Sequence, residues 1–310
     1  MQILVLGGSG FVGRHLVARL AADGHRVVVP TRRRERARHL ILLPTVDVVE
    51  ADVHDPAVLA TLVRGAAAAI NLVGILNESR RGDFDRVHVE LPRKLIAACR
   101  AASVPRLLHM SALNADTQGP SDYLRSKGRA EALVTASGLQ WTIFQPSIIV
   151  GREDSFLNLF AKLQRVLPVI ALACAGARFQ PVGVDDVAAA YVRALADDET
   201  HGQRYRLCGP HVYTLRQLVA YVGELTSYRR PIVALGPGLS MLQARVLERL
   251  PGKLMSRDNL ASMKRDSVCD CEYPALLGGP PTALEAIAPE YLAPAAQTGR
   301  SAPRRPRRGG

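Results

Sequence analysis

Three glycines near the start of the sequence, Gly7, Gly10 and Gly13, are evenly spaced between a short apolar segment and a segment with helical periodicity. The first glycine allows a tight turn, the second removes a Cβ that would block a pyrophosphate, and the third lets the helix pack closely on the strand. The N-terminal N–H groups of such a helix attract phosphates. The pattern therefore predicts a dinucleotide-binding loop. Its expected binding residues are Gly7, Ser9, Gly10, Phe11, Val12 and Gly13.

The end of the second apolar segment distinguishes NAD(H) from NADP(H). An acid there would hydrogen-bond the ribose 2′-hydroxyl and repel a 2′-phosphate. The sequence instead continues with a run of three arginines, 32–34, and its first acid is Glu35. Because a guanidinium can bind a phosphate through two hydrogen bonds, we expect NADP(H) as the cofactor and Arg32 as its first contact. The alternative is NAD(H), with the arginines forming a solvated charge run.

A tyrosine and a lysine, Tyr123 and Lys127, are four residues apart in a helical segment and therefore lie on one helical face. A nearby ammonium group lowers the pKa of a phenol, which would give a proton donor or acceptor beside a nicotinamide. Ser111, at the end of the preceding strand-like segment, can polarise a carbonyl. We predict Tyr123, Lys127 and Ser111 as catalytic residues for hydride transfer to or from a carbonyl or alcohol. The alternative is that Tyr123 and Lys127 only hold the nicotinamide ribose.

Strand-like and helical segments alternate through the first half of the chain. This alternation predicts an α/β fold, a Rossmann-type doubly wound parallel sheet over residues 1–150. The strand-like segments are 2–6, 26–30, 46–51, 66–73, 106–110 and 140–144, and the helical ones are 11–22, 33–40, 56–64, 84–102 and 123–137.

After residue 150 the alternation becomes irregular, and we expect a smaller α/β substrate or partner lobe over 151–293. Segments near 179–208 are expected to return to the sheet. Residues 294–310 can bury almost nothing and are predicted to be a disordered basic tail. Within the lobe, a helix over 239–250 is expected to pack Leu242, Val246, Leu247 and Leu250 into the core. The alternative is that this helix docks on a membrane or a protein partner.

Composition narrows the class of protein. The five cysteines are scattered and odd in number, so we expect reduced thiols, no metal site and a cytoplasmic location. We find no signal-peptide pattern and no apolar stretch long enough to span a membrane. The net charge of +12 lacks interleaved aromatics, so we expect no nucleic-acid binding. Attraction to the anionic inner face of a membrane or to an acidic partner is the alternative to a plain basic surface.

These residues resemble the short-chain dehydrogenase/reductase superfamily, in its extended and atypical branch. The resemblance covers about residues 1–290 and is closest to the NADPH-binding accessory subunit of respiratory complex I and its bacterial relatives. Beyond the glycine loop and Tyr123/Lys127, it is carried by Asp52-Val53, Asn71-Leu-Val-Gly74, His109-Met-Ser-Ala-Leu-Asn-Ala115, Gln145-Pro-Ser-Ile-Ile-Val-Gly-Arg-Glu-Asp154 and Phe179-Gln-Pro-Val182. It implies that Asp52 and Val53 lie by the adenine. Its further implied cofactor-binding residues are Asn71, Val73, Gly74, Pro146 and Ser147, together with Tyr123 and Lys127.

The sequence lacks two residues that form the proton relay in enzymes of this family, an asparagine and the active-site serine. His88 stands nearest to the family's relay asparagine, and Leu113 falls where the active-site serine belongs. Ser121 is a poorer substitute by position. The resemblance therefore implies an NADP(H)-binding oxidoreductase acting on a carbonyl or alcohol in quinone or respiratory metabolism. The alternatives are a non-catalytic nucleotide-holding subunit, assembly factor or sensor attached to complex I or ubiquinone synthesis, and a sugar-nucleotide epimerase or dehydratase.

Overall fold

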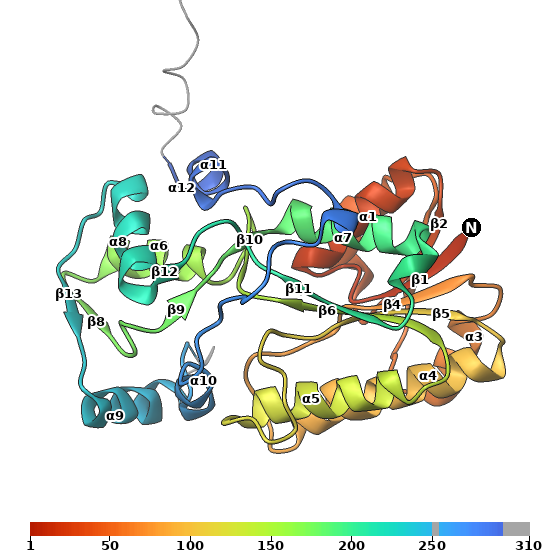
Figure 1. Cartoon of the computed structure of the whole chain (residues 1–310), viewed down its shortest axis with the longest axis horizontal. Coiled ribbons are helices and arrows are strands. Elements are labelled where there is room, and N and C mark those ends of the chain that lie inside the picture. Colours follow the sequence, from red (N-terminus) through yellow and green to blue (C-terminus); the bar gives the residue numbers. More distant parts are fainter. Residues whose placement is uncertain (250–253, 294–310) are drawn as a thin grey trace, which may run out of the picture.

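A computed structural model describes residues 1–249 and 254–293, and its largest element is a parallel sheet of seven strands (Figure 1). The strand order is β11-β6-β5-β4-β1-β2-β3, so the chain winds outward from β1 in both directions. This confirms the predicted doubly wound Rossmann fold. The strands are β1 Gln2–Leu6, β2 Arg26–Thr31, β3 Val46–Glu50, β4 Ala68–Asn71, β5 Arg106–Met110, β6 Gln140–Pro146 and β11 Gln203–Leu207.

The apolar run of β1 is buried on both faces of the sheet. Ile3 and Val5 pack under one layer of helices, whereas Leu4 and Leu6 pack under the other, and all four side chains have no exposed area. Such two-sided burial is typical of a parallel sheet covered by crossover helices. One layer contains α1 Phe11–Ala22, α2 Arg38–Ile41 and α7 Val184–Ala196, and the other contains α3 Pro56–Leu62, α4 Leu91–Ala101 and α5 Asp122–Thr135.

Two predicted helices of the first half differ in detail from the structure. The expected helix over 33–40 is a 3-10 turn, Arg34–Ala37, followed by the short α2. The expected helix over 84–102 begins with a π-helical segment, Asp85–Glu90, before α4. π-helical turns are often found next to functional sites, and this one carries His88.

The second half builds a smaller lobe beside the sheet from short two-stranded pairs and helices (Figure 1). β7 Ile149–Val150 pairs with β10 Val182–Gly183, β9 Arg178–Phe179 with β12 Tyr213–Thr214, and β8 Ile170–Leu172 with β13 Ile232–Ala234. The helices of this half outside α7 are α6 Leu157–Val166, α8 Leu215–Thr226, α9 Pro237–Leu247, α10 Arg257–Ser262, α11 Leu284–Ile287 and α12 Pro289–Leu292. The predicted tail, 294–310, lies outside the described residues.

The expected orientation of α9 is wrong. Leu242 and Val246 are 57% and 52% exposed, whereas the side chains that α9 buries are the small Ser240 and Ala244. Ser240 and Ala244 are four residues apart and lie on one helical face, so the helix turns its narrow side to the lobe. Leu250, which was predicted on the same apolar face, lies outside the described residues.

Candidate nucleotide and active site

The glycine loop joins β1 to α1 as the sequence predicted. Gly7 has a φ of +80°, and a Cβ on Gly13 would lie 2.2 Å from the Gly7 carbonyl oxygen. No side chain caps α1, whose N-cap is Gly10. The N–H groups of the first turn are therefore able to bind an anion, which is the arrangement that a pyrophosphate requires.

The turn after β3 gathers positive charge beside Asp52. The Asp52 carboxylate accepts a hydrogen bond from the His54 N–H at 3.0 Å, and Lys94 Nζ donates to the His54 carbonyl at 2.7 Å. Burial lowers the pKa of His54, and the charges of Arg86, Lys94 and Arg32 lower it further, against the opposing effect of Asp52. Arg32 thus lies near the predicted adenine-binding turn. The sequence analysis had not identified Lys94 or Arg86.

The end of β4 is held by a buried polar pair. Asn71 Nδ2 donates to His109 Nδ1 at 3.2 Å, and Asn71 Oδ1 accepts from the Val73 N–H at 3.2 Å. With Nδ1 as the acceptor, the neutral His109 ring carries its proton on Nε2. In the described part of the chain, neither His109 Nε2 nor the nearby Ser111 Oγ has a hydrogen-bond partner, although both are buried. Unpartnered buried polar atoms are uncommon, and these two lie near the end of β5, His109 on the strand and Ser111 directly after it.

Lys127 lies where β4, β5 and α5 meet. Its side chain is only 4% exposed, and Nζ donates to the Met110 carbonyl at 3.1 Å. A Cβ on Gly74 would lie 3.2 Å from Nζ, so the loop after β4 passes directly against the ammonium group. Burial lowers the pKa of Lys127 to about 8, and Glu131 partly opposes this.

Tyr123 lies on the same helix within a group of aromatic rings. Its ring centroid is 5.9 Å from that of Phe84 and 5.6 Å from that of His88. Burial raises the pKa of Tyr123 to about 12, and the Asp258 carboxylate adds to the increase. This pKa is above the ordinary value, whereas Lys127 was expected to lower it, and the causes of the shift are burial and Asp258.

His88 has no free ring nitrogen. Nε2 accepts from the Ile75 N–H at 3.0 Å, and Nδ1 lies 2.8 Å from Ser126 Oγ, which itself donates to the Tyr123 carbonyl. This network requires a neutral ring with its proton on Nδ1, in agreement with a pKa lowered to about 2, chiefly by burial. His88 therefore holds the loop after β4 against α5 and does not replace the relay asparagine with a titrating group.

The segment 256–262 covers the start of α5, a contact that the sequence analysis missed. The Asp258 carboxylate accepts from the N–H groups of Asp122 and Tyr123 at 2.7 and 3.1 Å. Ser262 Oγ donates to Ser121 Oγ at 2.8 Å, while Ser121 also accepts from the Leu124 N–H as the N-cap. Ser121 is thus a helix cap. The short polar sequence around Asp258 signals the start of a helix. It contains no signal that could predict the contact with the distant N-terminus of α5.

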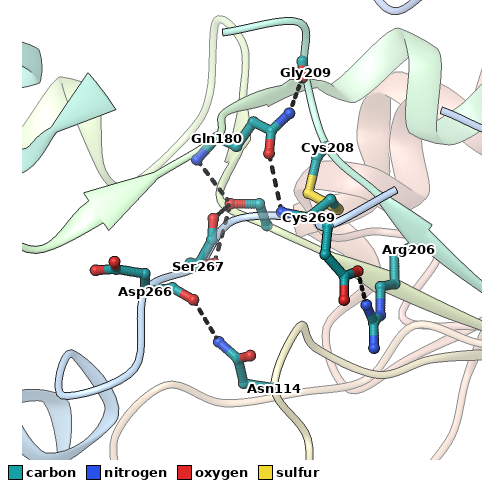
Figure 2. Close-up of a disulfide and its surroundings, with 10 residues drawn as sticks. Asn114, Gln180, Arg206, Cys208, Gly209, Asp266, Ser267 and Cys269 are labelled. Carbon is teal, nitrogen blue, oxygen red and sulfur yellow. Dashed lines mark hydrogen bonds and ion pairs between the residues drawn. A yellow bond between two sulfur atoms is a disulfide. The ribbon is translucent and has the colours of Figure 1, made fainter. Parts of the chain in front are cut away.

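Residues 265–271 form a second crossing segment, here called the strap, over the ends of β5 and β6 (Figure 2). Ser147 Oγ, at the end of β6 and next to Pro146, donates to the Ser267 carbonyl at 2.7 Å. Asn114 Nδ2 donates to the Asp266 carbonyl at 2.8 Å. The predicted cofactor-binding residue Ser147 is thereby tied to the strap.

A disulfide between Cys208 and Cys269 anchors the strap to the end of β11, and the Cys269 N–H donates to Gln180 Oε1 at 2.9 Å (Figure 2). The prediction of reduced cysteines is wrong for this pair. The two cysteines are 61 positions apart, so only the path of the strap brings them together. Cys99, Cys174 and Cys271 are free thiols.

Two further features were sought in the part of the chain that the structure describes. No three His, Cys, Asp or Glu side chains gather there as a metal site. Among the described helices, none has the length and apolar character needed to cross a membrane.

Comparison with known proteins places this geometry in a family. Residues 7–198 match the NAD(P)H-binding family model. The mouse (Mus musculus) mitochondrial NADH dehydrogenase (ubiquinone) 1 alpha subcomplex subunit 9 is 36% identical over 228 residues, which is 72% of this chain and 60% of the mouse protein. The Neurospora crassa mitochondrial NADH-ubiquinone oxidoreductase 40 kDa subunit is 30% identical over 86% of this chain and 72% of its own length. A ceramide reductase of Caulobacter vibrioides is 34% identical over 61% of this chain and 59% of its own length. The chain thus spans about 60% of the length of two of these relatives.

Solved structures show the same fold at lower identity. The dTDP-glucose 4,6-dehydratase DesIV from Streptomyces venezuelae, with NAD and TYD bound, superposes with a TM-score of 0.73. The match covers 94% of this chain and 96% of DesIV at 19% identity. At this identity the similarity is one of fold, and the residues of the site must support any chemistry.

Proposed function

The chain belongs to the NAD(P)H-binding family with the short-chain dehydrogenase/reductase fold, and from this premise we propose that it binds NADP(H) and reduces a carbonyl. The main support is that Lys127 Nζ donates to the carbonyl of Met110, the last residue of β5, and that the buried hydroxyl of the next residue, Ser111, has no partner in the described residues. Tyr123 lies on the same helix as Lys127. Ligands of doubly wound sheets bind at the carboxyl ends of the strands. A dinucleotide with its pyrophosphate on the glycine loop would extend its nicotinamide toward these residues.

The proposed roles follow from the state of each side chain. With a pKa of about 12, Tyr123 is protonated at neutral pH and is suited to donate its proton to a carbonyl oxygen as hydride arrives. Ser111 Oγ, which has no partner in the described residues, would hydrogen-bond the same oxygen. Lys127 would hold the nicotinamide ribose.

The preference for NADP(H) rests on the charge near the turn after β3. The charges of Arg32, Lys94 and Arg86 all act on His54, and Arg32 directly follows β2, where a 2′-phosphate would lie. The opposing acid is Asp52, whose carboxylate is engaged by the His54 N–H. We propose the glycine loop for the pyrophosphate, Asp52 and Val53 for the adenine, and residues of the β4 and β6 ends for the nicotinamide side. These last are Asn71, Val73, Gly74, Pro146 and Ser147.

The proposed substrate is an apolar carbonyl compound, either a quinone-related molecule or a lipid. This is supported by relatives named as ubiquinone oxidoreductase subunits and as a ceramide reductase. The proposed location is the cytoplasm, with peripheral contact at the inner face of the membrane or with a respiratory complex. We propose residues 1–150, with the returning segments near 179–208, as the nucleotide-binding domain and the rest of 151–293 as the substrate or partner lobe.

Turnover can be tested with the full chain, NADPH and a panel of apolar ketones, ceramide precursors and short-chain quinones. We expect nucleotide oxidation that falls at least a hundredfold in Tyr123→Phe while NADPH affinity stays within twofold. Tyr228→Phe, a remote and partly exposed tyrosine, serves as the control and should keep full activity. Equal rates in Tyr123→Phe and wild type would rule out proton donation by Tyr123.

A second candidate function is a nucleotide-holding subunit with little turnover. It is favoured by the His88 ring, whose two nitrogens are occupied by Ile75 and Ser126, so that the family's proton relay has no titrating replacement there. In this case Tyr123→Phe would leave the cellular phenotype intact, whereas a variant of the glycine loop would abolish it. A sugar-nucleotide epimerase or dehydratase is supported by fold similarity alone.

A further inference from the structure

Helix α9 exposes its large apolar side chains and buries its small ones, which is the reverse of most helices on a globular lobe. Leu239, Leu242 and Val246 are 59%, 57% and 52% exposed, whereas the residues packed inward are the small Ser240 and Ala244. Surface helices usually turn their large apolar side chains to the core. The observed orientation leaves an apolar strip on the outer side, because positions 239, 242 and 246 follow the helical repeat.

Arginines lie along one side of this strip. Arg245, on α9, and Arg249, in the turn that follows the helix, are both exposed. Arg245 forms no ion pair within the described residues. The nearest acid on the element, Glu248, is half-buried and already accepts from Arg257. The exposed face of α9 is therefore apolar and cationic at once.

A second exposed apolar segment lies on the same lobe, before β8. Val166, Leu167 and Val169 are exposed, with Val166 at 78%, and Arg165 beside them is exposed as well. β8 pairs in parallel with β13, the strand that leads into α9, and Val233 of β13 is also exposed. α9, β8 and β13 lie together at the end of the molecule away from the large sheet (Figure 1).

We propose that this surface, α9 together with residues 165–169 and β13, docks on a lipid bilayer that carries anionic headgroups. Large aliphatic side chains can enter the acyl boundary while arginine stems keep their guanidinium groups at the phosphates. With eleven residues, α9 is too short to span a membrane but long enough to lie in the interface. The net charge of +12 adds a long-range attraction to the same partner. The proposal does not depend on the reaction proposed above.

The surface has a consequence for the neighbouring site. α10 follows α9 in the chain and packs on it through Leu260, which shares a buried cluster with Ala244. α10 carries Asp258, which binds the N–H groups at the start of the helix that bears Tyr123. The docking element is thus next to the cover of the candidate active site.

The test is co-sedimentation of the full chain with vesicles of phosphatidylglycerol and phosphatidylcholine in equal parts, compared with pure phosphatidylcholine. We expect binding to the anionic vesicles that weakens at least tenfold in the double variant Leu242→Asp/Val246→Asp. In Arg245→Gln/Arg249→Gln we expect a loss of about fivefold for each arginine, and only for anionic vesicles. Leu42→Asp, at an 84% exposed leucine of the first domain, is the matched control and should bind like wild type.

Two readouts make the outcome decisive. All variants keep the five arginines of 300–310, so a difference between them reports on the α9 surface. NADPH affinity that is equal in all four proteins shows that each variant is folded. Equal vesicle binding by wild type and Leu242→Asp/Val246→Asp would overturn the proposal. So would a dimer in sedimentation velocity that this variant dissociates, since the surface would then belong to a second copy of the chain.

Discussion

The glycine loop and the cover of the candidate active site are built in opposite ways. The loop takes its geometry from seven consecutive residues, and the atoms nearest to a Cβ at Gly13 belong to Gly7 and Gly8. The cover, formed by α10 and the strap, reaches the site through contacts over long sequence separations, such as 136 residues from Asp258 to Asp122 and 120 from Ser267 to Ser147. The loop proposed for the pyrophosphate is therefore encoded locally, whereas the cover of the candidate site is encoded by tertiary structure. The two regions should respond differently to substitution.

The largest expected effect is in the loop. Gly13→Ala would place a Cβ 2.2 Å from the Gly7 carbonyl oxygen, and no flexible side chain can yield there. We expect NADPH binding to be lost and the free energy of unfolding to fall by about 4 kcal/mol or more. Fluorescence titration and denaturant unfolding measure these effects. Gly176→Ala, where a Cβ meets open space, should change neither, and an unaffected Gly13→Ala would show that the loop has been placed incorrectly.

The disulfide tests the cover. Cys208→Ser removes a cross-link that spans 61 positions, and we expect the oxidised protein to lose about 2–4 kcal/mol of stability. NADPH affinity should change much less than in Gly13→Ala, because the strap reaches the proposed cofactor-binding residues through Ser147, whereas Gly13 belongs to the loop proposed to hold the pyrophosphate. Cys271→Ser, at an exposed free thiol, is the control. Finding five reactive thiols in the unreduced chain would contradict the disulfide, and it would agree with a reducing cytoplasm.

The buried Lys127 should make the stability of the protein depend on pH. Its pKa is about 8 in the folded chain and 10.5 ordinarily, so the unfolded chain binds more protons between these pH values. The stability of wild type relative to Lys127→Met should therefore increase from pH 8 to pH 10.5, by up to about 3 kcal/mol. Lys162→Met, at an exposed lysine of α6, should show no such change. A stability difference between wild type and Lys127→Met that does not change with pH would show that the ammonium group is in water.

The smallest effect is expected at Asp258. Asp258→Ala removes the acceptor for the N–H groups of Asp122 and Tyr123, and loss of a helix cap costs about 1 kcal/mol. Asp23→Ala, at an exposed aspartate after α1, should cost less. If Asp258→Ala lowered NADPH affinity as much as Gly13→Ala, the glycine loop and the cover would not act independently, and the proposed contrast between them would be wrong.

The same contrast explains which features could be predicted from the sequence. The seven strands and the glycine loop were predictable because apolar runs and glycine spacing report directly on backbone geometry. The charge around His54 was only partly predictable, since Lys94 belongs to a helix 40 positions along the chain. The cysteine pair and Asp258 have no local signal for their partners. The outward face of α9 was mispredicted because periodicity identifies an apolar face but not the side on which the lobe lies.

The central claim is that the glycine loop and Arg32 hold NADP(H) next to Tyr123. Calorimetric titration of the full chain with NADPH and with NADH, in wild type and Arg32→Ala, tests it most directly. We expect one NADPH per chain, bound at least tenfold more tightly than NADH, with this preference largely lost in Arg32→Ala. Equal or tighter binding of NADH to wild type, or no binding of either nucleotide, would contradict it.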